Sequence, residues 1–165
     1  MKPVLLDTGV IVALLQRDSQ RHEESVRAIS ALSRPLVTCE AVIVESCHLL
    51  RRFPGAPEAI LANLKQGEFE IPFALLESVT EVRTIMHKYR DVPASFADAC
   101  LIHMADELDT GDILTLDSDF LTYRWRRTKP FPPLSRPWNC VAHCCQFAGD
   151  KAVFQICGSQ MSPSK

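Results

Sequence analysis

The chain has 165 residues, of which 47% are hydrophobic and 23% charged, and its formal net charge is −2. A chain of this length normally forms one domain with a sizeable core, and this composition excludes a disordered protein. The near-neutral charge gives no general attraction to a phosphate backbone. Binding of nucleic acid would therefore need a local basic patch or bridging metal ions.

The sequence also bears on the cellular compartment. No apolar stretch reaches the roughly 18 to 20 residues that span a bilayer, and residues 1–4 lead directly into an apolar strand pattern. We therefore expect a cytoplasmic protein without a membrane segment. The cysteines number seven, and this odd count favours reduced thiols over a framework of disulfides.

Apolar residues recur in a pattern that predicts strands alternating with helices. The unbroken apolar run at residues 4–6 is typical of a buried parallel strand, and Thr8 can cap the helix that follows at residues 10–15. Further helices are predicted at residues 22–32, 39–52, 57–65, 75–89 and 96–108, and further strands at residues 36–38, 69–71 and 112–116. This alternation predicts an α/β fold in which helices cover both faces of a parallel sheet.

The character of the chain changes near residue 134. We interpret residues 1–133 as one domain and residues 134–165 as a C-terminal extension of unknown role, which holds four of the cysteines. Metal-binding residue types occur there at Cys140, His143, Cys144 and Cys145. They lack paired CxxC spacing, so a loosely attached segment is favoured over a zinc site.

The tripeptide Asp7-Thr8-Gly9 is the signature of aspartic proteases, but its context excludes that class. Those enzymes place it in a loop of an all-β barrel, need a second copy and use a glycine-rich flap, whereas a helix follows it here. What remains is an acid at the carboxyl end of the first strand, where α/β sheets gather ligand-binding groups. Capping of the following helix by Asp7 is the structural alternative.

Three further acids share these features. Helical spacing puts Glu45 and Asp98 on apolar faces without Lys or Arg, and Asp117 follows another predicted strand, with Asp119 behind it. A buried carboxylate is costly without a partner charge. Carboxylates that converge without basic partners are the arrangement that Mg²⁺ or Mn²⁺ demands. His48, one turn after Glu45, is more typical of a core histidine than of a general base.

Four segments together resemble a known family: LLDTGVIVALL, TCEAVIVESCHLL, YRDVPASFADACLIHMADEL and DILTLDSDF. They resemble, in order and at suitable spacing over residues 1–131, the four acidic motifs of PIN-domain ribonucleases, the fold of VapC-type toxins in bacterial toxin-antitoxin pairs. Carried over to this chain, the acids of the family's metal site are Asp7, Glu45, Asp98 and Asp117, with Asp119 as a candidate fifth. Residues 134–165 depart from the family pattern.

The resemblance implies a fold, an activity and partners. The fold is a three-layer α/β/α sandwich around a central, mainly parallel sheet, usually as a homodimer. The activity is cleavage of single-stranded RNA with Mg²⁺ or Mn²⁺, under inhibition by a small antitoxin protein. Residues 10–15, 39–52 and 57–65 carry more apolar side chains than one sheet face can cover, which predicts a groove for that partner.

A cluster of acids repels RNA until a cation occupies it, so basic side chains must surround the acidic centre. The candidates for phosphate contact, with Tyr123 and Trp125 between them for base stacking, are Arg124, Arg126, Arg127 and Lys129. An edge strand with solvated charges is the structural alternative.

Two other functions stay open at this point. An inactive PIN-like interaction module would tolerate loss of one or more acids, whereas all four are present. A metal-dependent phosphatase of the haloacid-dehalogenase type would want a second Asp two residues after Asp7, where this chain has Gly9. An RNA cleavage assay that includes EDTA would separate all three.

Overall fold

A short parallel sheet organises the chain. The computed structural model describes residues 1–92 and 94–132. Strand β1 (Val4–Leu6) lies between β2 (Leu36–Val37) and β3 (Ile113–Leu114), and both neighbours run parallel to it. The carboxyl ends of all three strands therefore lie at the same edge of the sheet.

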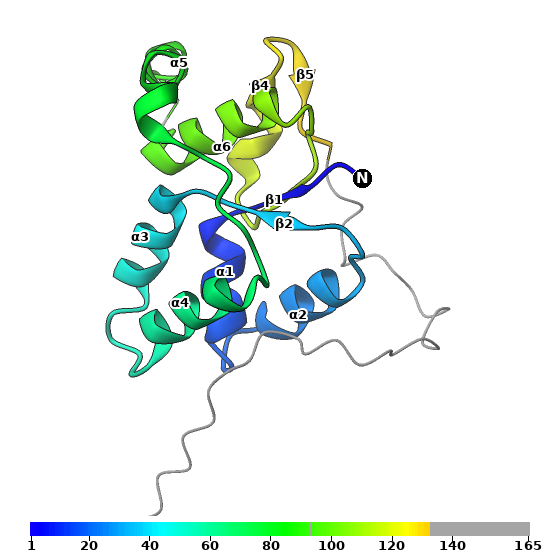
Figure 1. The fold of residues 1–165 in the computed structure, drawn as a ribbon, viewed down its shortest axis with the longest axis vertical. Coiled ribbons are helices and arrows are strands. Elements are labelled where there is room, and N and C mark those ends of the chain that lie inside the picture. The colour runs from blue at the N-terminus through cyan, green and yellow to red at the C-terminus, as the bar shows by residue number, and fades with distance from the viewer. Residues whose placement is uncertain (93, 133–165) are drawn as a thin grey trace, which may run out of the picture.

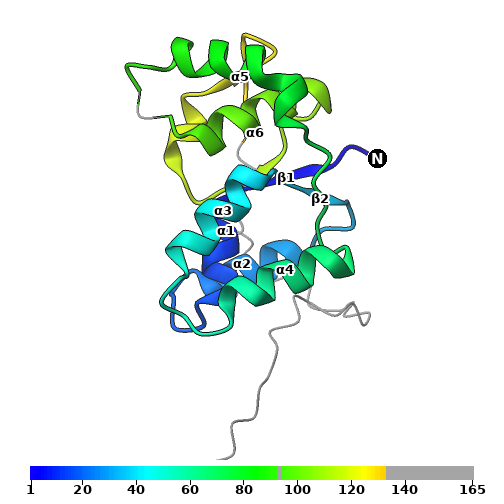
Figure 2. The same cartoon turned by 60° about the vertical axis from the view of Figure 1, so that its left-hand side comes forward.

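Helices cover both faces of this sheet, so the structure confirms the predicted three-layer α/β/α fold (Figures 1 and 2). The layer below it in Figure 1 consists of α1 (Thr8–Leu15), α2 (His22–Ser30), α3 (Glu40–Leu49) and α4 (Ala56–Gln66). The layer above it consists of α5 (Leu75–Lys88), α6 (Phe96–Glu107) and the antiparallel hairpin of β4 (Arg124–Trp125) and β5 (Lys129–Pro130). No helix among the described residues is long and apolar enough to cross a membrane.

The predicted helices are confirmed with small shifts of their ends, and two local predictions are wrong. Residues 69–71 do not form a strand, because only Glu70 makes a parallel bridge, to Val37. Thr8 does not cap the first helix. The cap is Asp7, whose side chain accepts a hydrogen bond from the Thr8 backbone N–H.

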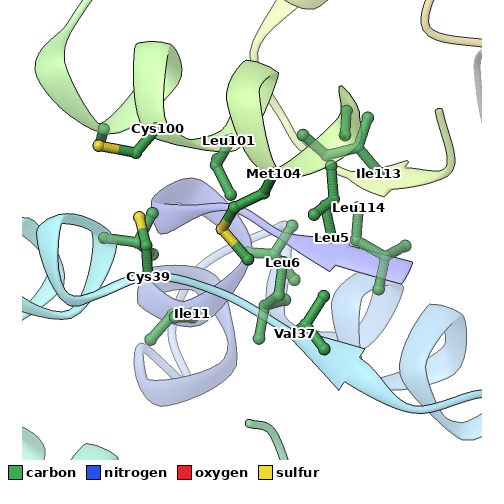
Figure 3. Packing of buried hydrophobic residues seen from close by; sticks show 14 of the residues in the cluster. Leu5, Leu6, Ile11, Val37, Cys39, Cys100, Leu101, Met104, Ile113 and Leu114 are labelled. Atoms are coloured by element: carbon green, nitrogen blue, oxygen red, sulfur yellow. The ribbon is translucent and has the colours of Figure 1, made fainter. Parts of the chain in front are cut away.

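The hydrophobic core lies on both faces of β1 (Figure 3). Leu5 and Leu6 are fully buried, with Leu101 and Met104 of α6 above them and Ile11 of α1 below. A strand covered in this way must be apolar on both faces, which explains the unbroken run in the sequence. Polar side chains that could bind a ligand are therefore expected at the ends of the strands rather than along them.

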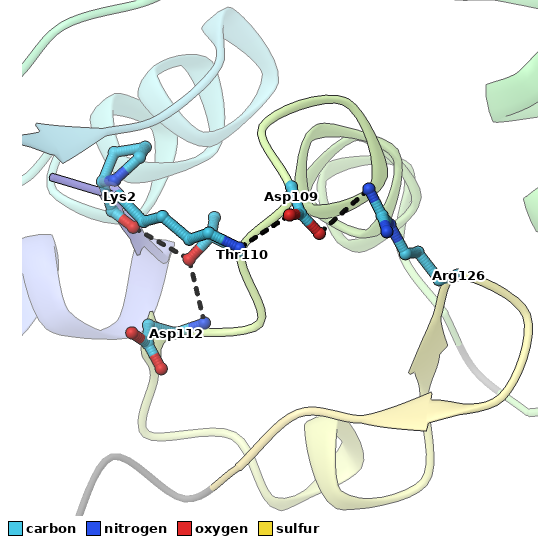
Figure 4. Close-up of polar contacts among 6 residues, drawn as sticks. Lys2, Asp109, Thr110, Asp112 and Arg126 are labelled. Atoms are coloured by element: carbon cyan, nitrogen blue, oxygen red, sulfur yellow. Dashed lines mark hydrogen bonds and ion pairs between the residues drawn. The ribbon is translucent and has the colours of Figure 1, made fainter.

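The amino edge of the sheet is tied together by paired charges (Figure 4). Asp109, between α6 and β3, accepts from Lys2 Nζ at 2.7 Å and pairs with Arg126 of the hairpin at 2.9 Å. Beside it, the Thr110 hydroxyl donates to the Pro3 carbonyl at 2.9 Å and accepts from the Asp112 N–H at 3.3 Å. This edge therefore holds acids that have basic partners.

Gly111 lies against the Trp125 indole of the hairpin, and we predict that Gly111→Ala destabilises the protein. A Cβ at residue 111 would lie 2.8 Å from Cε2 of the Trp125 indole, whose Nε1 donates to the Pro130 carbonyl. Such overpacking lowers the free energy of unfolding by about 1–3 kcal/mol, which urea denaturation can measure. Gly9→Ala is the control, because its Cβ would meet Leu116 at 3.4 Å, an ordinary contact. Equal stability of both variants would contradict the prediction.

Candidate functional site

Asp7 stands where the carboxyl ends of β1 and β3 meet. Its backbone N–H donates to the Leu114 carbonyl at 3.1 Å, which fixes the residue beside the end of β3. Its side chain is only 5% exposed and accepts two hydrogen bonds at 2.7 Å, from the Thr8 N–H on Oδ1 and from the Thr115 hydroxyl on Oδ2. Asp7 is therefore both the cap of α1 and a member of the predicted site.

Glu45 reaches the same place from α3. The Thr8 hydroxyl donates to Glu45 Oε2 at 2.8 Å, and the side chain is half-buried. Thr8 thus contacts two acids at once, Asp7 through its backbone and Glu45 through its side chain. This contact places Glu45 next to the end of β1, as its position in the sequence predicts.

Asp98 lies in the first turn of α6 and is 8% exposed. It forms a capping box with Ser95, in which the Ser95 N–H donates to Asp98 Oδ2 at 2.8 Å and the Asp98 N–H donates to Ser95 Oγ at 3.0 Å. The Tyr123 hydroxyl lies 3.4 Å from the same Oδ2. The side chain therefore stabilises the start of a helix as well as belonging to the acidic cluster.

Asp117 and Asp119 follow β3 and begin a short 3-10 helix. Asp117 is exposed, and its Oδ1 accepts from the Asp119 N–H at 2.8 Å. Its own N–H donates to the Thr115 hydroxyl at 2.9 Å, the same hydroxyl that contacts Asp7. Asp117 is thereby linked to the centre of the site, whereas the described contacts of Asp119 are those of a turn residue.

The four acids act on one another electrostatically. Burial, reinforced by the charges of Asp98 and Asp117, raises the pKa of Asp7 from 3.8 to about 6, although the Thr115 and Thr8 hydrogen bonds lower it. Burial also raises the pKa of Asp98, with further contributions from the charges of Asp117 and Glu45. None of the ion pairs within residues 1–92 and 94–132 involves any of the four. Within this part of the chain, no ion pair therefore compensates their negative charge.

The donor set suits a hard divalent cation. All donors are carboxylate oxygens, and Mg²⁺ is bound by as few as one or two carboxylates together with waters. As the described side chains stand, no three of the His, Cys, Asp and Glu residues are grouped tightly enough to hold one ion. The site is thus an open cluster rather than a closed cage of protein ligands, which is the form that Mg²⁺ tolerates.

The predicted basic residues lie on the β4–β5 hairpin. Arg126 pairs with Asp109 at the amino edge of the sheet, and α6 carries the chain about 14 Å from Asp98 to its last residue, Glu107, before Asp109 follows. Lys129 Nζ lies 4.7 Å from the centre of the Trp125 ring. Arg124 donates to three carbonyls of residues 121–123, and Arg127 is exposed. Of these four residues, Arg126 is therefore held at the amino edge of the sheet by its ion pair, and contact of the hairpin with RNA stays a prediction.

The predicted roles of the aromatic residues and of His48 differ from what the structure shows. Tyr123 and Trp125 are 0% and 8% exposed, so the prediction that RNA bases stack on them is wrong. His48 is exposed, so its interpretation as a core histidine is also wrong. The cysteines and histidine of residues 140–145, considered for zinc, lie outside the described residues.

Sequence reasoning missed the hydroxyl groups that hold the acids. Ser95 could have been found, since Ser-x-x-Asp before an apolar run is a capping-box pattern. Thr8 and Thr115 had no such signal, because their partners lie 37 and 108 residues away in the sequence. Tyr123 was noted for stacking, whereas its hydroxyl points to Asp98.

Comparison with known proteins identifies the family. A family model described as the PIN domain matches residues 4–125. The chain belongs to the PIN domain family. Ribonuclease VapC26 of Mycobacterium tuberculosis is 28% identical over 116 residues, which cover 69% of this chain and 86% of that protein.

A solved structure shares the fold of this PIN domain. It is the crystal structure of VapC20 from Mycobacterium tuberculosis, a sarcin-ricin loop cleaving toxin, with a TM-score of 0.68 and 19% identity. The match covers 77% of this chain and 99% of the VapC20 chain. Together with the family model, it confirms the PIN resemblance inferred from the four acidic segments.

The raised pKa of Asp7 predicts an unusual dependence of stability on pH without metal. Because the folded state binds this proton more tightly than the unfolded state, stability falls as the pH rises from 3.8 through about 6. The full loss at neutral pH is about 3 kcal/mol. We expect urea denaturation in EDTA to give higher stability at pH 5 than at pH 7, and a smaller difference for Asp7→Asn. Stability that rises from pH 5 to 7 would show that Asp7 is stabilised as a carboxylate.

Proposed function

We propose that this chain is a Mg²⁺- or Mn²⁺-dependent endoribonuclease that cleaves single-stranded RNA, and that it is the toxin of a toxin-antitoxin pair. The observation that carries the proposal is the cluster of Asp7, Glu45, Asp98 and Asp117, which has two buried members and no basic partner among the described residues. The names of the related proteins support it, since one is a ribonuclease and the other an RNA-cleaving toxin.

Each acid has a distinct part in this proposal. Asp7 and Asp98, the two buried carboxylates, would hold the cation, and Glu45 and Asp117 would complete a second, weaker position or orient the attacking water. When bound, a divalent ion polarises a phosphodiester oxygen and activates water for in-line attack. Thr8, Thr115 and Ser95 keep the carboxylates oriented through the hydrogen bonds described above.

Asp98→Asn tests the proposal because it removes a charge and keeps an acceptor for the Ser95 N–H. We expect RNA cleavage to fall by at least about a hundredfold, since metal ions supply several kcal/mol of transition-state stabilisation. In EDTA, its melting temperature should equal or exceed that of the unmutated protein, because burial disfavours the charged form. Mg²⁺ should stabilise the unmutated protein by about 2.7 kcal/mol at a hundredfold excess over Kd, and the variant less.

Two matched variants give this experiment its controls. Asp98→Ala also loses the hydrogen bond from the Ser95 N–H, which costs about 0.5–1.5 kcal/mol, so it should melt below Asp98→Asn in EDTA. Asp91→Asn removes an exposed charge that pairs with Arg90, and it should cleave RNA normally. An Asp98→Asn protein that cuts RNA at the normal rate would overturn the proposed function. One that melts well below the unmutated protein in EDTA would remove Asp98 from the metal site.

The proposed antitoxin would dock on α3 and α4. Val44, Phe53 and Leu61 are exposed apolar side chains of α3, the following turn and α4. Helix α1 was predicted to line this groove, but all its apolar residues are buried or half-buried, so it contributes no exposed apolar side chain. An apolar surface of this kind fits the apolar face of a partner helix.

We predict that the product of a short upstream reading frame co-purifies with this chain and relieves its toxicity. Val44→Asp combined with Leu61→Asp should abolish co-purification, because the charges would be buried without partners. Leu76→Asp on α5, where the side chain is 90% exposed, is the control and should leave the complex intact. Equal retention of the partner by both variants would place the interface elsewhere.

Two further expectations stay proposals. Contact of the hairpin with RNA is tested by Arg127→Ala, since loss of a phosphate contact reduces the salt dependence of RNA binding. A homodimer, which the family resemblance implies, is tested by sedimentation equilibrium of the full chain.

A further inference from the structure

Three of the four acids belong to one continuous chain of hydrogen bonds. It runs from Glu45 to the Thr8 hydroxyl at 2.8 Å, and from the Thr8 N–H to Asp7 at 2.7 Å. It continues from Asp7 to the Thr115 hydroxyl at 2.7 Å and from that hydroxyl to the Asp117 N–H at 2.9 Å. Two threonines therefore connect the carboxylates of Glu45 and Asp7 with the backbone of Asp117, from three separate parts of the chain.

The Thr115 hydroxyl has its direction fixed by its two partners. It accepts from the Asp117 N–H, and its single proton therefore goes to Asp7 Oδ2. The Thr8 N–H holds the other oxygen, Oδ1, so the carboxylate of Asp7 cannot rotate without losing a hydrogen bond. Each carboxylate oxygen has about two acceptor sites, so each keeps one for a cation.

We propose that Thr115 is a positioning residue, whose hydroxyl orients the Asp7 carboxylate and the backbone at Asp117 for binding a divalent cation. The inference rests on the proposed function, because it assumes that the acids bind metal. Groups that orient metal ligands without touching the ion typically change metal affinity about 10–100-fold when they are removed.

Thr110 supplies a matched control at the other end of β3 (Figure 4). Its hydroxyl also accepts from the N–H two residues later, that of Asp112, and also donates to an oxygen next to β1. That oxygen is the Pro3 backbone carbonyl, at the edge of the sheet away from the acids. Removal of either hydroxyl deletes the same kind of structural bond, but only Thr115 contacts a carboxylate of the site.

The experiment compares Thr115→Val, Thr115→Ser and Thr110→Val as full chains. Binding of Mn²⁺ alone is measured by calorimetry, and RNA cleavage is measured as a function of Mn²⁺ concentration. We expect Thr115→Val to bind Mn²⁺ about 10–100-fold more weakly and to regain cleavage at high Mn²⁺. Thr115→Ser keeps the hydroxyl and should bind normally. Thr110→Val should lower the melting temperature and leave Mn²⁺ affinity unchanged.

The outcomes separate this inference from the function beneath it. If the unmutated protein binds Mn²⁺ and cuts RNA while Thr115→Val binds Mn²⁺ equally well, the positioning role is overturned and the proposed function stands. Equal weakening by Thr110→Val and Thr115→Val also overturns it, because the effect would then be structural. An unmutated protein that neither binds Mn²⁺ nor cuts RNA overturns both. Thr115→Ala, checked by circular dichroism, replaces Thr115→Val if that variant does not fold.

Discussion

Burial of the Asp7 carboxylate at the end of β1 is the constraint around which the site is built. The side chain loses most of its hydration, and two other acids add repulsion, so its pKa rises to about 6. Three features oppose this cost: the Thr8 N–H, the Thr115 hydroxyl and the N-terminus of α1, whose dipole favours a negative charge. They do not cancel it, since the pKa remains raised. A bound cation would supply the missing compensation.

The two edges of the sheet treat their acids in opposite ways. At the amino edge, Asp109 pairs with Lys2 and Arg126, and Asp112 pairs with Arg34. At the carboxyl edge, the clustered acids accept hydrogen bonds from hydroxyls and backbone N–H groups, and no described ion pair reaches them. The chain therefore has bases to pair with carboxylates and uses them elsewhere. This segregation supports a ligand role for the unpaired acids, because the acids Asp109 and Asp112 at the amino edge are paired.

The sequence was sufficient for features that depend on local pattern. An unbroken apolar run predicted β1, helical periodicity predicted α1 to α6, and strand ends followed by acids predicted where Asp7 and Asp117 lie. Features set by long-range contacts were beyond it. The run at residues 69–71 has strand composition, but only Glu70 bridges β2. Tyr123 sits in a basic segment and yet packs against Tyr89 and Phe120 in the core.

Asp98 shows why function and stability are not simply opposed at this site. Burial and neighbouring charges disfavour the ionised form of its side chain. In the capping box, however, the side-chain oxygen Oδ2 accepts a hydrogen bond from the Ser95 N–H at the start of α6. A carboxylate at the first turn also interacts favourably with the helix dipole. The helix thus offsets part of the cost of holding a charge in the cluster, and the cluster gains an acid whose side chain is oriented before any cation binds. Asp7 is itself the N-cap of α1, where its side chain accepts from the Thr8 N–H. Two helices therefore begin at the site, each with a buried acid at its N-terminus, and their dipoles make the concentration of negative charge there tolerable.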